Sequence, residues 1–478
     1  MAERLALRLA VARAVGGLSR LRGGGGTSAP GKVLLRLAPG AIASLGARLR
    51  RGSVLLSATN GKTTTATLAA GVLADAGVEI VHNRAGANMA GGVATALLRA
   101  AHGRDLIDGE LGLFEVDELW LAPLVRDLQP RTIVLSNLFR DQLDRYGELE
   151  AIADSWQRTL SRSDARLVLN ADDPVIADLG RERDDALYFG VEDDSLALPG
   201  LAHAADAKHC RRCGAPYVFD VVYLGHLGHY HCPNCDRRRP DPAITASAVT
   251  LEGVTGARFT LRTPAGEAEV RLALPGLYNV YNALAAAALA TALEIPFARI
   301  ADGLAATRAA FGRGEALRLP INGAAARADS PSPASGAVDR ELRILLVKNP
   351  AGANEVLRTL ALEPGEHELL GVLNDRIADG RDVSWIWDAD FELLAERVGR
   401  ITCSGTRAAD LATRMKYAGV APERIRVEPR LQQALDSALA TADPGAAARP
   451  LYALPTYTAM LELRELLVAR GVADSAWA

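Results

Sequence analysis

Short apolar runs alternate along the first half of the chain with longer stretches in which alanine and leucine recur at helical spacing. The short runs predict buried strands at Val54–Ser57, Thr132–Ser136 and Leu167–Leu169. The periodic stretches predict helices at Ala66–Ala76, Met89–Ala101 and Leu149–Leu160. Strands that alternate with helices in this way favour a mostly parallel, doubly wound α/β sheet.

The pattern changes twice before residue 340. Residues His203–Arg239 are rich in Cys, His, Arg and Tyr and interrupt the alternation. Ala243–Leu274 then predicts β-strands, and Leu277–Leu293 predicts a long alanine-rich helix. Gly323–Val338 is small, polar and punctuated by proline, which is typical of a linker or a disordered loop.

A second, smaller α/β domain is expected after this linker. Leu342–Val347 predicts a strong strand. Further helices and strands are predicted at Glu355–Leu360, Leu369–Leu373, Phe391–Val398, Arg407–Tyr417, Leu431–Ala440 and Leu461–Ala469. We therefore divide the chain into an N-terminal helix and lead-in (1–53), a central domain (54–322), a linker (323–340) and a C-terminal α/β domain (341–478).

Composition narrows the class of protein. The chain has 478 residues, of which 49% are hydrophobic and 23% are charged, as in ordinary globular proteins of two or three domains. The net charge of −3 gives no electrostatic reason to expect nucleic acid. The stretch Met1–Leu21 is interpreted as an amphipathic packing helix, with a membrane-surface helix as the alternative. Because no apolar run is long enough to span a bilayer, we expect a cytoplasmic enzyme.

The stretch Val54–Thr65, VLLSATNGKTTT, has the character of a phosphate-binding loop. A buried strand leads into Thr59-Asn60-Gly61-Lys62-Thr63-Thr64, and a helix follows. In such a turn the backbone N–H groups face the phosphates, the lysine binds the β/γ oxygens and the Thr63 hydroxyl ligates Mg²⁺. The full pattern has Gly where Leu56 stands, so the strand–turn–helix context supports the prediction more than the motif alone.

Carboxylates follow in Phe114-Glu115-Val116-Asp117-Glu118. In a strand, Glu115 and Asp117 would share a face and could hold Mg²⁺ opposite the phosphate loop; the alternative is a solvated acidic turn. Polar residues also follow the strand Thr132–Ser136 directly, where ligands bind in open α/β sheets.

Four of the five cysteines form two C-x-x-C pairs, Cys210 with Cys213 and Cys232 with Cys235. Four thiolates at this spacing predict a structural, tetrahedral Zn²⁺ ribbon with no open coordination position, rather than a redox pair or two disulfides. The nearby histidines are expected on the surface or in the hairpin. The fifth, Cys403, lies between an apolar strand and a helix and is interpreted as buried packing.

Six motifs occur in the order found in the Mur ligase family, the ATP-dependent ligases of peptidoglycan assembly, which this chain resembles. They are ATNGKTT, FEVDE, NLFRDQLDRYG, LNADDP, LPGLYNVYNALAA and FGRGE, between about Val54 and Glu315. The resemblance implies a P-loop ATPase domain that uses ATP and Mg²⁺. It assigns the nucleotide to Thr59, Asn60, Gly61, Lys62, Thr63, Thr64, Asn88, Asn279 and Arg313, and Mg²⁺ to Thr63 and Glu115, with Lys62 and Glu115 as catalytic groups. Gln142 replaces the usual metal-binding His of the amino-acid-adding members, which puts a second Mg²⁺ in doubt.

The four-cysteine insertion, KNPAGANEVL (Lys348–Leu357) and LNDRIADGRDVSWIWDADFE (Leu373–Glu392) resemble one branch of that family, the ligase-like subunits of a lipid II isoglutaminyl synthase. The resemblance implies amidation of the α-carboxyl of D-glutamate in lipid II, at the inner face of the plasma membrane, through an acyl phosphate. It also implies a heterodimer with a glutaminase-like subunit of the GatD type, which would supply ammonia. An aspartate of the ligase subunit would complete the partner's Cys–His arrangement; we choose Asp388, with Asp382 and Asp390 as alternatives.

Two other classes of function stay open from the sequence. A stand-alone Mur-type ligase would join an amino acid in place of ammonia, and a His at position 142 would have favoured it. A non-catalytic scaffold would use nucleotide only to order the ribbon and a partner surface, and loss of Lys62 or Glu115 would have favoured that. Neither explains the acidic, tryptophan-containing segment as well as the amidotransferase interpretation.

Overall fold

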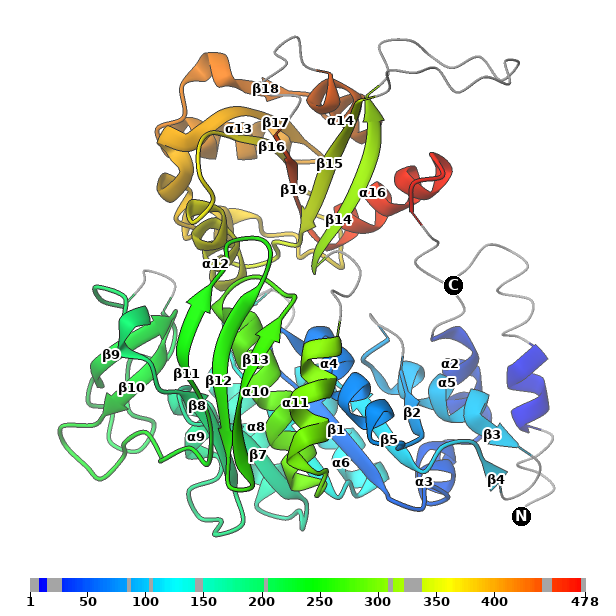
Figure 1. The fold of residues 1–478 in the computed structure, drawn as a ribbon. Coiled ribbons are helices and arrows are strands. Elements are labelled where there is room, and N and C mark those ends of the chain that lie inside the picture. The colour runs from blue at the N-terminus through cyan, green and yellow to red at the C-terminus, as the bar shows by residue number, and fades with distance from the viewer. Residues whose placement is uncertain are drawn as a thin grey trace.

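The described residues fold into two lobes, each built on its own sheet, as the computed structural model in Figure 1 shows. It describes residues 8–14, 28–83, 87–102, 106–141, 149–201, 205–307, 313–321, 338–440 and 449–473. We call residues 8–307 the central lobe and residues 313–473 the C-terminal lobe. The predicted α/β class with a second, smaller domain is confirmed.

The central lobe contains a nine-stranded sheet in the order β13-β12-β11-β8-β7-β6-β1-β5-β2. Its strands from β2 to β11 are parallel, and β12 and β13 extend one edge in antiparallel pairing. Their bounds are β1 Ser53–Ser57, β2 Ile80–His82, β5 Leu111–Glu115, β6 Thr132–Leu135, β7 Arg166–Asn170, β8 Leu187–Val191, β11 Ile244–Leu251, β12 Ala257–Thr263 and β13 Gly266–Leu272. A separate small ribbon pairs β3 Ala101–His102 with β4 Leu106–Ile107.

Helices cover both faces of this sheet, so the inner strands are buried on both sides and consist of continuous apolar runs. On one face pack α4 Lys62–Asp75, α10 Leu277–Ala292 and α11 Phe297–Ala306. On the other pack α2 Ala29–Leu37, α3 Ala41–Gly46, α5 Ala90–Ala100, α6 Leu121–Leu128 and α8 Leu149–Leu160. Short helices are η1 Glu118–Trp120, α9 Pro174–Asp178 and η2 Asp194–Leu196.

The segment before β1 belongs to the central lobe. Leu34, Ile42 and Leu45 are buried in the core beneath α5 and α6, and residues 8–14 are helical with Leu9 buried in the same core. This supports a packing helix for the described part of Met1–Leu21. The lead-in is therefore packed into the body of the lobe.

The cysteine-bearing insertion forms a two-stranded antiparallel hairpin, β9 Val218–Leu224 and β10 Leu227–His231. Figure 1 shows it at the side of the central lobe, next to β8 and α9. Its small core contains Tyr217, Tyr230 and the thiols of Cys210 and Cys232. The insertion is a ribbon, as the spacing of the cysteines predicts.

The C-terminal lobe has a six-stranded sheet in the order β14-β15-β19-β16-β17-β18, parallel except for β14. Its strands are β14 Arg313–Ile321, β15 Val338–Leu345, β16 His367–Val372, β17 Val398–Ser404, β18 Ile425–Val427 and β19 Leu451–Pro455. Its helices are α12 Pro350–Ala361, α13 Ala408–Tyr417, α14 Leu431–Leu439 and α16 Tyr457–Ala469, with short turns at η3 Ser384–Trp387, η4 Phe391–Arg397 and η5 Pro422–Arg424. Two apolar clusters fill its two faces.

The sheet topology corrects one predicted boundary. We placed residues up to 322 in the central domain, but β14 pairs along its length with β15 and so belongs to the C-terminal sheet. The sequence could not indicate this because the pairing spans the predicted linker. Residues 322–337 lie outside the described part of the chain, so the linker prediction stays a prediction there.

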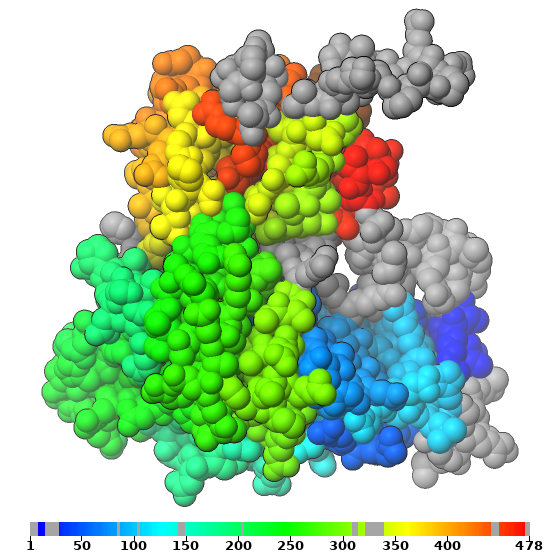
Figure 2. All heavy atoms as spheres, viewed as in Figure 1, coloured from blue at the N-terminus to red at the C-terminus, as the bar shows by residue number. Residues whose placement is uncertain are grey.

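The lobes contact one another at the turn between β11 and β12 as well as at the phosphate loop. Val254 in that turn donates its N–H to Glu363 Oε1 at 2.7 Å, and its carbonyl accepts from Arg343 Nη1 at 2.6 Å. Figure 2 shows this continuous contact between the green strands and the yellow part of the C-terminal lobe. Among the described residues, no helix is both long and apolar enough to cross a membrane.

Candidate active site

The predicted phosphate loop leaves β1 at Ser57 and enters α4 at Lys62. Gly61 has a φ of 84°, and a Cβ there would lie 2.0 Å from Asn282 Oδ1 on α10. Only glycine fits both the left-handed conformation and this close approach. The first N–H groups of α4 have no carbonyl partner within the helix, so the turn can offer donors to an anion.

A neighbouring segment fixes the loop before any ligand binds. Asn60 N donates to Asn137 Oδ1 at 2.9 Å, and Asn137 Nδ2 donates to Asn60 O at 3.0 Å. The Thr59 hydroxyl accepts from Phe139 N at 3.0 Å and donates to the Phe139 carbonyl at 3.2 Å. Asn137 and Phe139 follow β6, whose carboxyl end lies beside that of β1. Polar groups at adjacent strand ends therefore hold the loop in shape.

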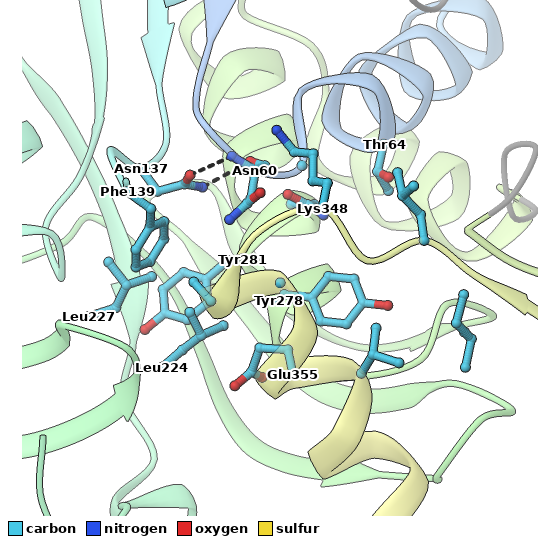
Figure 3. Close-up of a pocket in the computed structure, with 17 residues that line it drawn as sticks. Asn60, Thr64, Asn137, Phe139, Leu224, Leu227, Tyr278, Tyr281, Lys348 and Glu355 are labelled. Carbon is cyan, nitrogen blue, oxygen red and sulfur yellow. Dashed lines mark hydrogen bonds between the residues drawn. The ribbon is translucent and has the colours of Figure 1, made fainter. Parts of the chain in front are cut away.

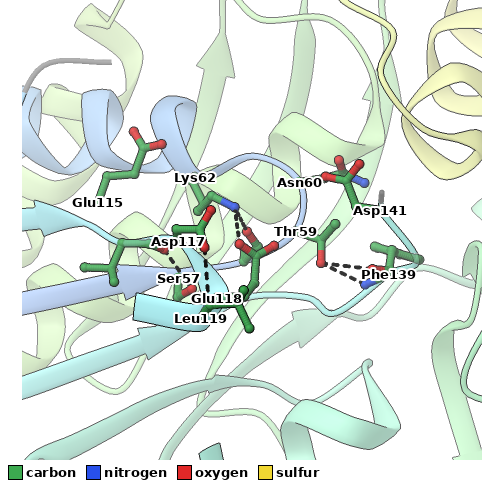
Figure 4. A network of polar contacts seen from close by, with 12 residues as sticks. Ser57, Thr59, Asn60, Lys62, Glu115, Asp117, Glu118, Leu119, Phe139 and Asp141 are labelled. Atoms are coloured by element: carbon green, nitrogen blue, oxygen red, sulfur yellow. Dashed lines mark hydrogen bonds and ion pairs between the residues drawn. The ribbon is translucent and has the colours of Figure 1, made fainter. Parts of the chain in front are cut away.

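Lys62 is buried and paired with a carboxylate. Its Nζ donates to Glu118 Oε2 at 2.9 Å and also to the Ala58 carbonyl (Figure 4). Burial lowers the pKa of Lys62, but the charge and hydrogen bond of Glu118, with weaker help from Glu115 and Asp117, raise it above its ordinary value overall. Lys62 thus carries its positive charge at neutral pH in a nearly dry site.

Thr63 and Glu115 meet beside this ion pair. The Thr63 hydroxyl donates to Glu115 Oε2 at 2.9 Å, and both residues are buried. Asn83 holds the strand end by accepting from Glu115 N at 2.9 Å and donating to its carbonyl at 2.8 Å. A hydroxyl and a carboxylate oxygen facing each other next to a phosphate loop fit the oxygen ligands that Mg²⁺ prefers.

One detail of the acidic motif differs from the prediction. We expected Glu115 and Asp117 to share a strand face, but β5 ends at Glu115 and Asp117 caps the short helix η1 by accepting from Leu119 N at 3.2 Å. The same turn brings the carboxylate of Glu118 to Lys62. An alternating-face argument fails here because the strand ends one residue after Phe114.

Other predicted nucleotide residues lie around the loop. Asn279, on α10, donates to the Pro275 carbonyl at 2.7 Å and accepts from Asn282 Nδ2 at 2.9 Å; Asn282 Oδ1 accepts from the Thr65 hydroxyl at 3.1 Å. Asn88 is half-buried, and its carbonyl accepts from Asp117 N at 2.8 Å. The side chain of Arg313 and residue Gln142 lie outside the described residues, so both assignments stay predictions.

Two residues of the C-terminal lobe, Lys348 and Asn349, reach the phosphate loop, although no role for either was predicted from the sequence. Lys348 Nζ donates to the Thr59 carbonyl at 3.1 Å and forms an ion pair with Asp141. Asn349 and Asn60 exchange side-chain hydrogen bonds at 2.9 and 3.3 Å. Asn349 also caps α12 by accepting from Gly352 N at 2.9 Å. The Asn-Pro pair after a strand is a helix-start signal that could have drawn attention to this place.

A pocket lies between the lobes, and we call it the inter-lobe pocket (Figure 3). Its phosphate-loop end is formed by Asn60, Gly61 and Thr64. Its apolar end is formed by side chains from α10, from α12 and β15, and from the insertion and the segment after β6: Phe139, Leu224, Leu227, Tyr278, Tyr281, Leu345 and Val356. Burial raises the pKa of Glu355, which lines the pocket from α12, although Arg358 opposes the shift. A pocket with one polar end and one apolar end suits a ligand that has a charged or polar group at one end and an apolar group at the other.

The four cysteines lie together as predicted. Cys210 Sγ is 3.6 Å from Cys235 Sγ, Cys213 Sγ is 3.4 Å from Cys232 Sγ, and all four sulfurs lie within 4.8 Å of one another. All four are free thiols, so they form no disulfide. Sulfurs at the corners of a tetrahedron around Zn²⁺ lie about 3.8 Å apart, so the donor set fits this metal. His226, predicted on the surface or in the hairpin, is in the hairpin turn but fully buried.

The acidic segment after β16 carries five aspartates, and most are engaged within their own lobe. Asp379 accepts from Thr458 N at 2.7 Å, Asp375 from the Thr406 hydroxyl at 2.8 Å, and Asp390 from Asn354 Nδ2 at 2.8 Å. Asp382 accepts from Ser384 N at 2.8 Å. Asp388 is half-exposed, and its Oδ2 lies 3.9 Å from Arg140 Nη2 in the central lobe. Exposed Trp387 and Tyr417 stand next to it, 5.8 Å apart between ring centres.

Two protein families match this chain. The family described as MurT ligase C-terminal matches residues 346–460, and the family described as Mur ligase middle domain matches residues 57–220. The first match covers α12, the acidic segment and β17–β19. The second covers the phosphate loop, the acidic residues Glu115, Asp117 and Glu118 and the first pair of cysteines.

Full-length relatives extend these matches. The lipid II isoglutaminyl synthase (glutamine-hydrolyzing) subunit MurT of Streptococcus pneumoniae is 32% identical over 95% of this chain and 95% of its own length. The corresponding subunit of Staphylococcus aureus is 30% identical over 84% of this chain and 85% of its own length. Among solved structures, a pseudomurein peptide ligase type C from Methanothermus fervidus superposes with a TM-score of 0.64 at 23% identity, covering 88% of this chain and 79% of that one, which shows the shared fold.

Proposed function

This chain belongs to the MurT family of Mur ligases, and from that premise we propose that it is the synthase subunit of a glutamine-dependent lipid II amidotransferase. The reaction is ATP-dependent amidation of the α-carboxyl of D-glutamate in the stem peptide of lipid II, giving D-isoglutamine. Ammonia comes from glutamine hydrolysed on a glutaminase-like partner subunit of the GatD type. The enzyme uses Mg²⁺ and holds a structural Zn²⁺.

One observation carries the proposal: a preformed phosphate loop faces the inter-lobe pocket with its charged side chains already paired. Lys62 bonds Glu118, and Thr63 bonds Glu115, in a buried setting at the end of β1 and β5. Phosphoryl transfer needs positioned positive charge more than covalent chemistry. A scaffold that merely bound nucleotide would have no use for this arrangement.

The chemistry runs in two balanced steps. A carboxylate oxygen of the substrate attacks the γ-phosphorus of ATP, and ADP leaves with the electrons of the broken P–O bond. The nitrogen lone pair of ammonia then attacks the acyl carbon; the C–O bond breaks, inorganic phosphate leaves, and the nitrogen loses a proton. Lys62 offsets charge on the transferring group and holds it in place. Thr63 and Glu115 would hold Mg²⁺, which supplies charge neutralisation at the phosphates.

The chain's own cysteines support the need for a partner. A glutaminase requires an activated thiolate. Four of the five cysteines form the metal-type cluster, and Cys403 is buried in the core beside β16, where burial raises its pKa to about 12. A thiol with such a pKa is protonated at neutral pH and is therefore a poor nucleophile. Because its side chain is buried, it is also inaccessible to a substrate. We infer that ammonia is made on another chain.

We propose that Asp388 completes the partner's Cys–His arrangement. Its carboxylate is half-exposed and lies 3.9 Å from Arg140 Nη2, whereas Asp375, Asp379 and Asp390 accept hydrogen bonds within the lobe. Arg140 precedes Asp141, the partner of Lys348 at the phosphate loop. A glutaminase bound over Asp388 would therefore release ammonia close to the ligase centre. The exposed rings of Trp387 and Tyr417 offer it a contact surface.

The deciding measurement is amidation of lipid II with ATP and glutamine, by this chain alone and with a co-produced glutaminase-like subunit. Free ammonium serves as the control donor, and lipid II in detergent micelles stands in for the inner face of the plasma membrane, where we place the reaction. We expect glutamine-dependent activity only with the partner, ammonium-dependent activity with this chain, and loss of both in Lys62→Ala. Joining of an amino acid by the chain alone would instead establish a stand-alone ligase, and ATP binding without turnover a scaffold.

The role of Asp388 is tested separately. Asp388→Asn should lower glutamine-dependent amidation by about 100-fold or more, because an unpositioned histidine is a poor base, and leave ammonium-dependent amidation unchanged. Asp382→Asn and Asp390→Asn are the matched controls and should retain both activities. If one of the controls shows the selective loss instead, that aspartate holds the role.

A further inference from the structure

The turn that joins β9 to β10, Leu224-Gly225-His226-Leu227, lies far in sequence from the phosphate loop but reaches the same pocket. Leu224 and Leu227 line its apolar end, beside Phe139 and Tyr281 (Figure 3). Both leucines are buried. The turn belongs to the cysteine-bearing insertion, whose cysteines lie at the other end of the same hairpin. One end of the ribbon thus holds the thiols and the other forms part of a pocket wall.

The turn is fixed in place by contacts with two other segments of the central lobe, at Phe139 and at Asp173. Gly225 has a φ of 59°, and a Cβ on it would lie 2.7 Å from the Phe139 ring. The His226 ring packs on Phe139 with 4.5 Å between ring centres, and its Nε2 lies 3.3 Å from Asp173 Oδ2. The same Asp173 oxygen accepts from Leu138 N at 2.9 Å. Leucines held by such contacts present a shaped surface to the pocket.

Phe139 links this wall to the phosphate loop. Its ring contacts the turn, and its backbone exchanges two hydrogen bonds with the Thr59 hydroxyl. A nucleotide with its phosphates at Asn60–Thr64 would direct its base toward the apolar end of the pocket, because the phosphate-loop end is occupied by phosphate. Flat heteroaromatic rings bind well between aromatic and aliphatic side chains.

We propose that the hairpin turn Leu224–Leu227 is the base-side wall of the nucleotide pocket, and that Leu224 and Leu227 set the affinity for ATP. The four-cysteine metal site then serves nucleotide binding, because it fixes the base of the hairpin that carries this wall. The inference rests on the proposed function, since it requires that the nucleotide occupy the inter-lobe pocket.

The test compares two probes on the full chain in the presence of Mg²⁺: ADP, and inorganic tripolyphosphate, which has no base. Binding is measured by titration calorimetry for wild type, Leu224→Ala, Leu227→Ala and the double variant. Each truncation removes apolar contact with the base, so we expect the Kd for ADP to rise by about ten-fold and the Kd for tripolyphosphate to stay unchanged. Val218→Ala, at the exposed far end of β9, is the matched control and should bind both probes as wild type does.

A second arm removes the metal with a chelator, or mutates Cys213→Ser and Cys235→Ser. The Kd for ADP should again rise while that for tripolyphosphate does not. If the stripped protein unfolds in a melting experiment, the leucine variants decide the question alone, and Leu227→Met, which keeps the contact area, should rescue ADP binding.

The possible failures are distinguishable. A folded double variant that binds ADP as wild type does would overturn the inference and leave the proposed function intact. Equal weakening of ADP and tripolyphosphate would also overturn it, because the effect would then come from the phosphate loop. A wild-type chain that binds neither probe would overturn the proposed function itself.

Discussion

The two ends of the inter-lobe pocket are built in different ways. At the phosphate-loop end, charged and hydroxyl side chains of the central lobe are already bonded to each other, as Lys62 is to Glu118 and Thr63 to Glu115. At the apolar end, Leu227, Tyr281 and Val356 come from three separate segments, one of them in the other lobe. The ion pair and the hydroxyl–carboxylate pair of the first end form within the central lobe, to which Lys348 and Asn349 of the other lobe add contacts, whereas the apolar end is complete only when the lobes are together.

Because of this difference, we expect changes at the two ends of the pocket to affect the catalytic rate and the binding of nucleotide separately. Preorganised charge acts on the transition state, so changes at the phosphate-loop end should lower kcat. Contacts assembled from several segments hold the ligand in all states, so changes at the apolar end or between the lobes should raise KM. The following variants test that division, from the largest expected effect to the smallest.

Lys62→Met should lower kcat for amidation with either donor by about 1,000-fold or more, since it removes the only cation of the central lobe that the described residues place in the loop. Leaving Glu118 buried without its cation also costs roughly 3–5 kcal/mol of stability. Steady-state assays with ammonium and a thermal melt measure the two effects. A kcat within ten-fold of wild type in a folded variant would contradict the role of Lys62 in phosphoryl transfer.

Glu115→Gln should raise the Mg²⁺ concentration needed for half-maximal rate by about ten-fold and lower kcat, because an amide is a weaker Mg²⁺ ligand than a carboxylate. The rate is measured against Mg²⁺ concentration at saturating ATP. Asp117→Asn is the matched control in the same segment; its carboxylate caps η1, so the Mg²⁺ requirement should stay close to that of wild type. Similar shifts in both variants would contradict the pairing of Thr63 with Glu115 as a metal site.

Lys348→Met should raise the KM for ATP by about five-fold with little change in kcat, because Lys348 joins the lobes through Asp141 and the Thr59 carbonyl. Asp141→Asn should act in the same direction. If the two residues act through their contact, the double variant will be no worse than the more impaired single variant. Fully additive effects would mean that each residue contacts the nucleotide independently.

Glu355→Gln should give the smallest effect, a pH-dependent gain of about 2 °C in melting temperature. Burial raises the pKa of Glu355, with Arg358 opposing, so the stability of the protonated form is present at low pH and is lost as pH rises through the folded pKa. The neutral amide avoids that loss, so the variant should be more stable at pH 8 and equal to wild type at pH 4. Calorimetric melts of the nucleotide-free protein at both pH values measure it.

Local patterns in the sequence predicted much of this molecule. The helix at Leu149–Leu160 has the bounds that its periodicity indicates, and the strand, turn and helix around Lys62 follow from residues adjacent in sequence. The four cysteines also meet as their spacing predicts. In each case the residues that determine the feature lie within a short segment of the sequence, so the local pattern was sufficient to predict it.

Features that depend on long-range contacts were not predictable in this way. Asp117 does not share a strand face with Glu115 as predicted, because the chain turns after β5; Asp117 caps η1, and Glu118 pairs with Lys62. Strand β14 joins a sheet across the predicted linker, and Lys348 reaches Thr59 over nearly three hundred residues. Leu224 and Leu227 look like ordinary hairpin residues in the sequence, and only the packing of His226 on Phe139 brings them to the pocket.

The exchange of hydrogen bonds between Asn60 and Asn349 has a consequence for the timing of turnover. In the proposed function a nucleotide would lie between the lobes, and separation of the lobes to release it would break both of these bonds along with the Lys348–Asp141 ion pair. We therefore expect the residence time of ADP, rather than the making of the amide bond, to limit the catalytic cycle when both substrates are abundant. The hydrogen bonds between Asn60 and Asn349 would then help to set the turnover rate of the enzyme.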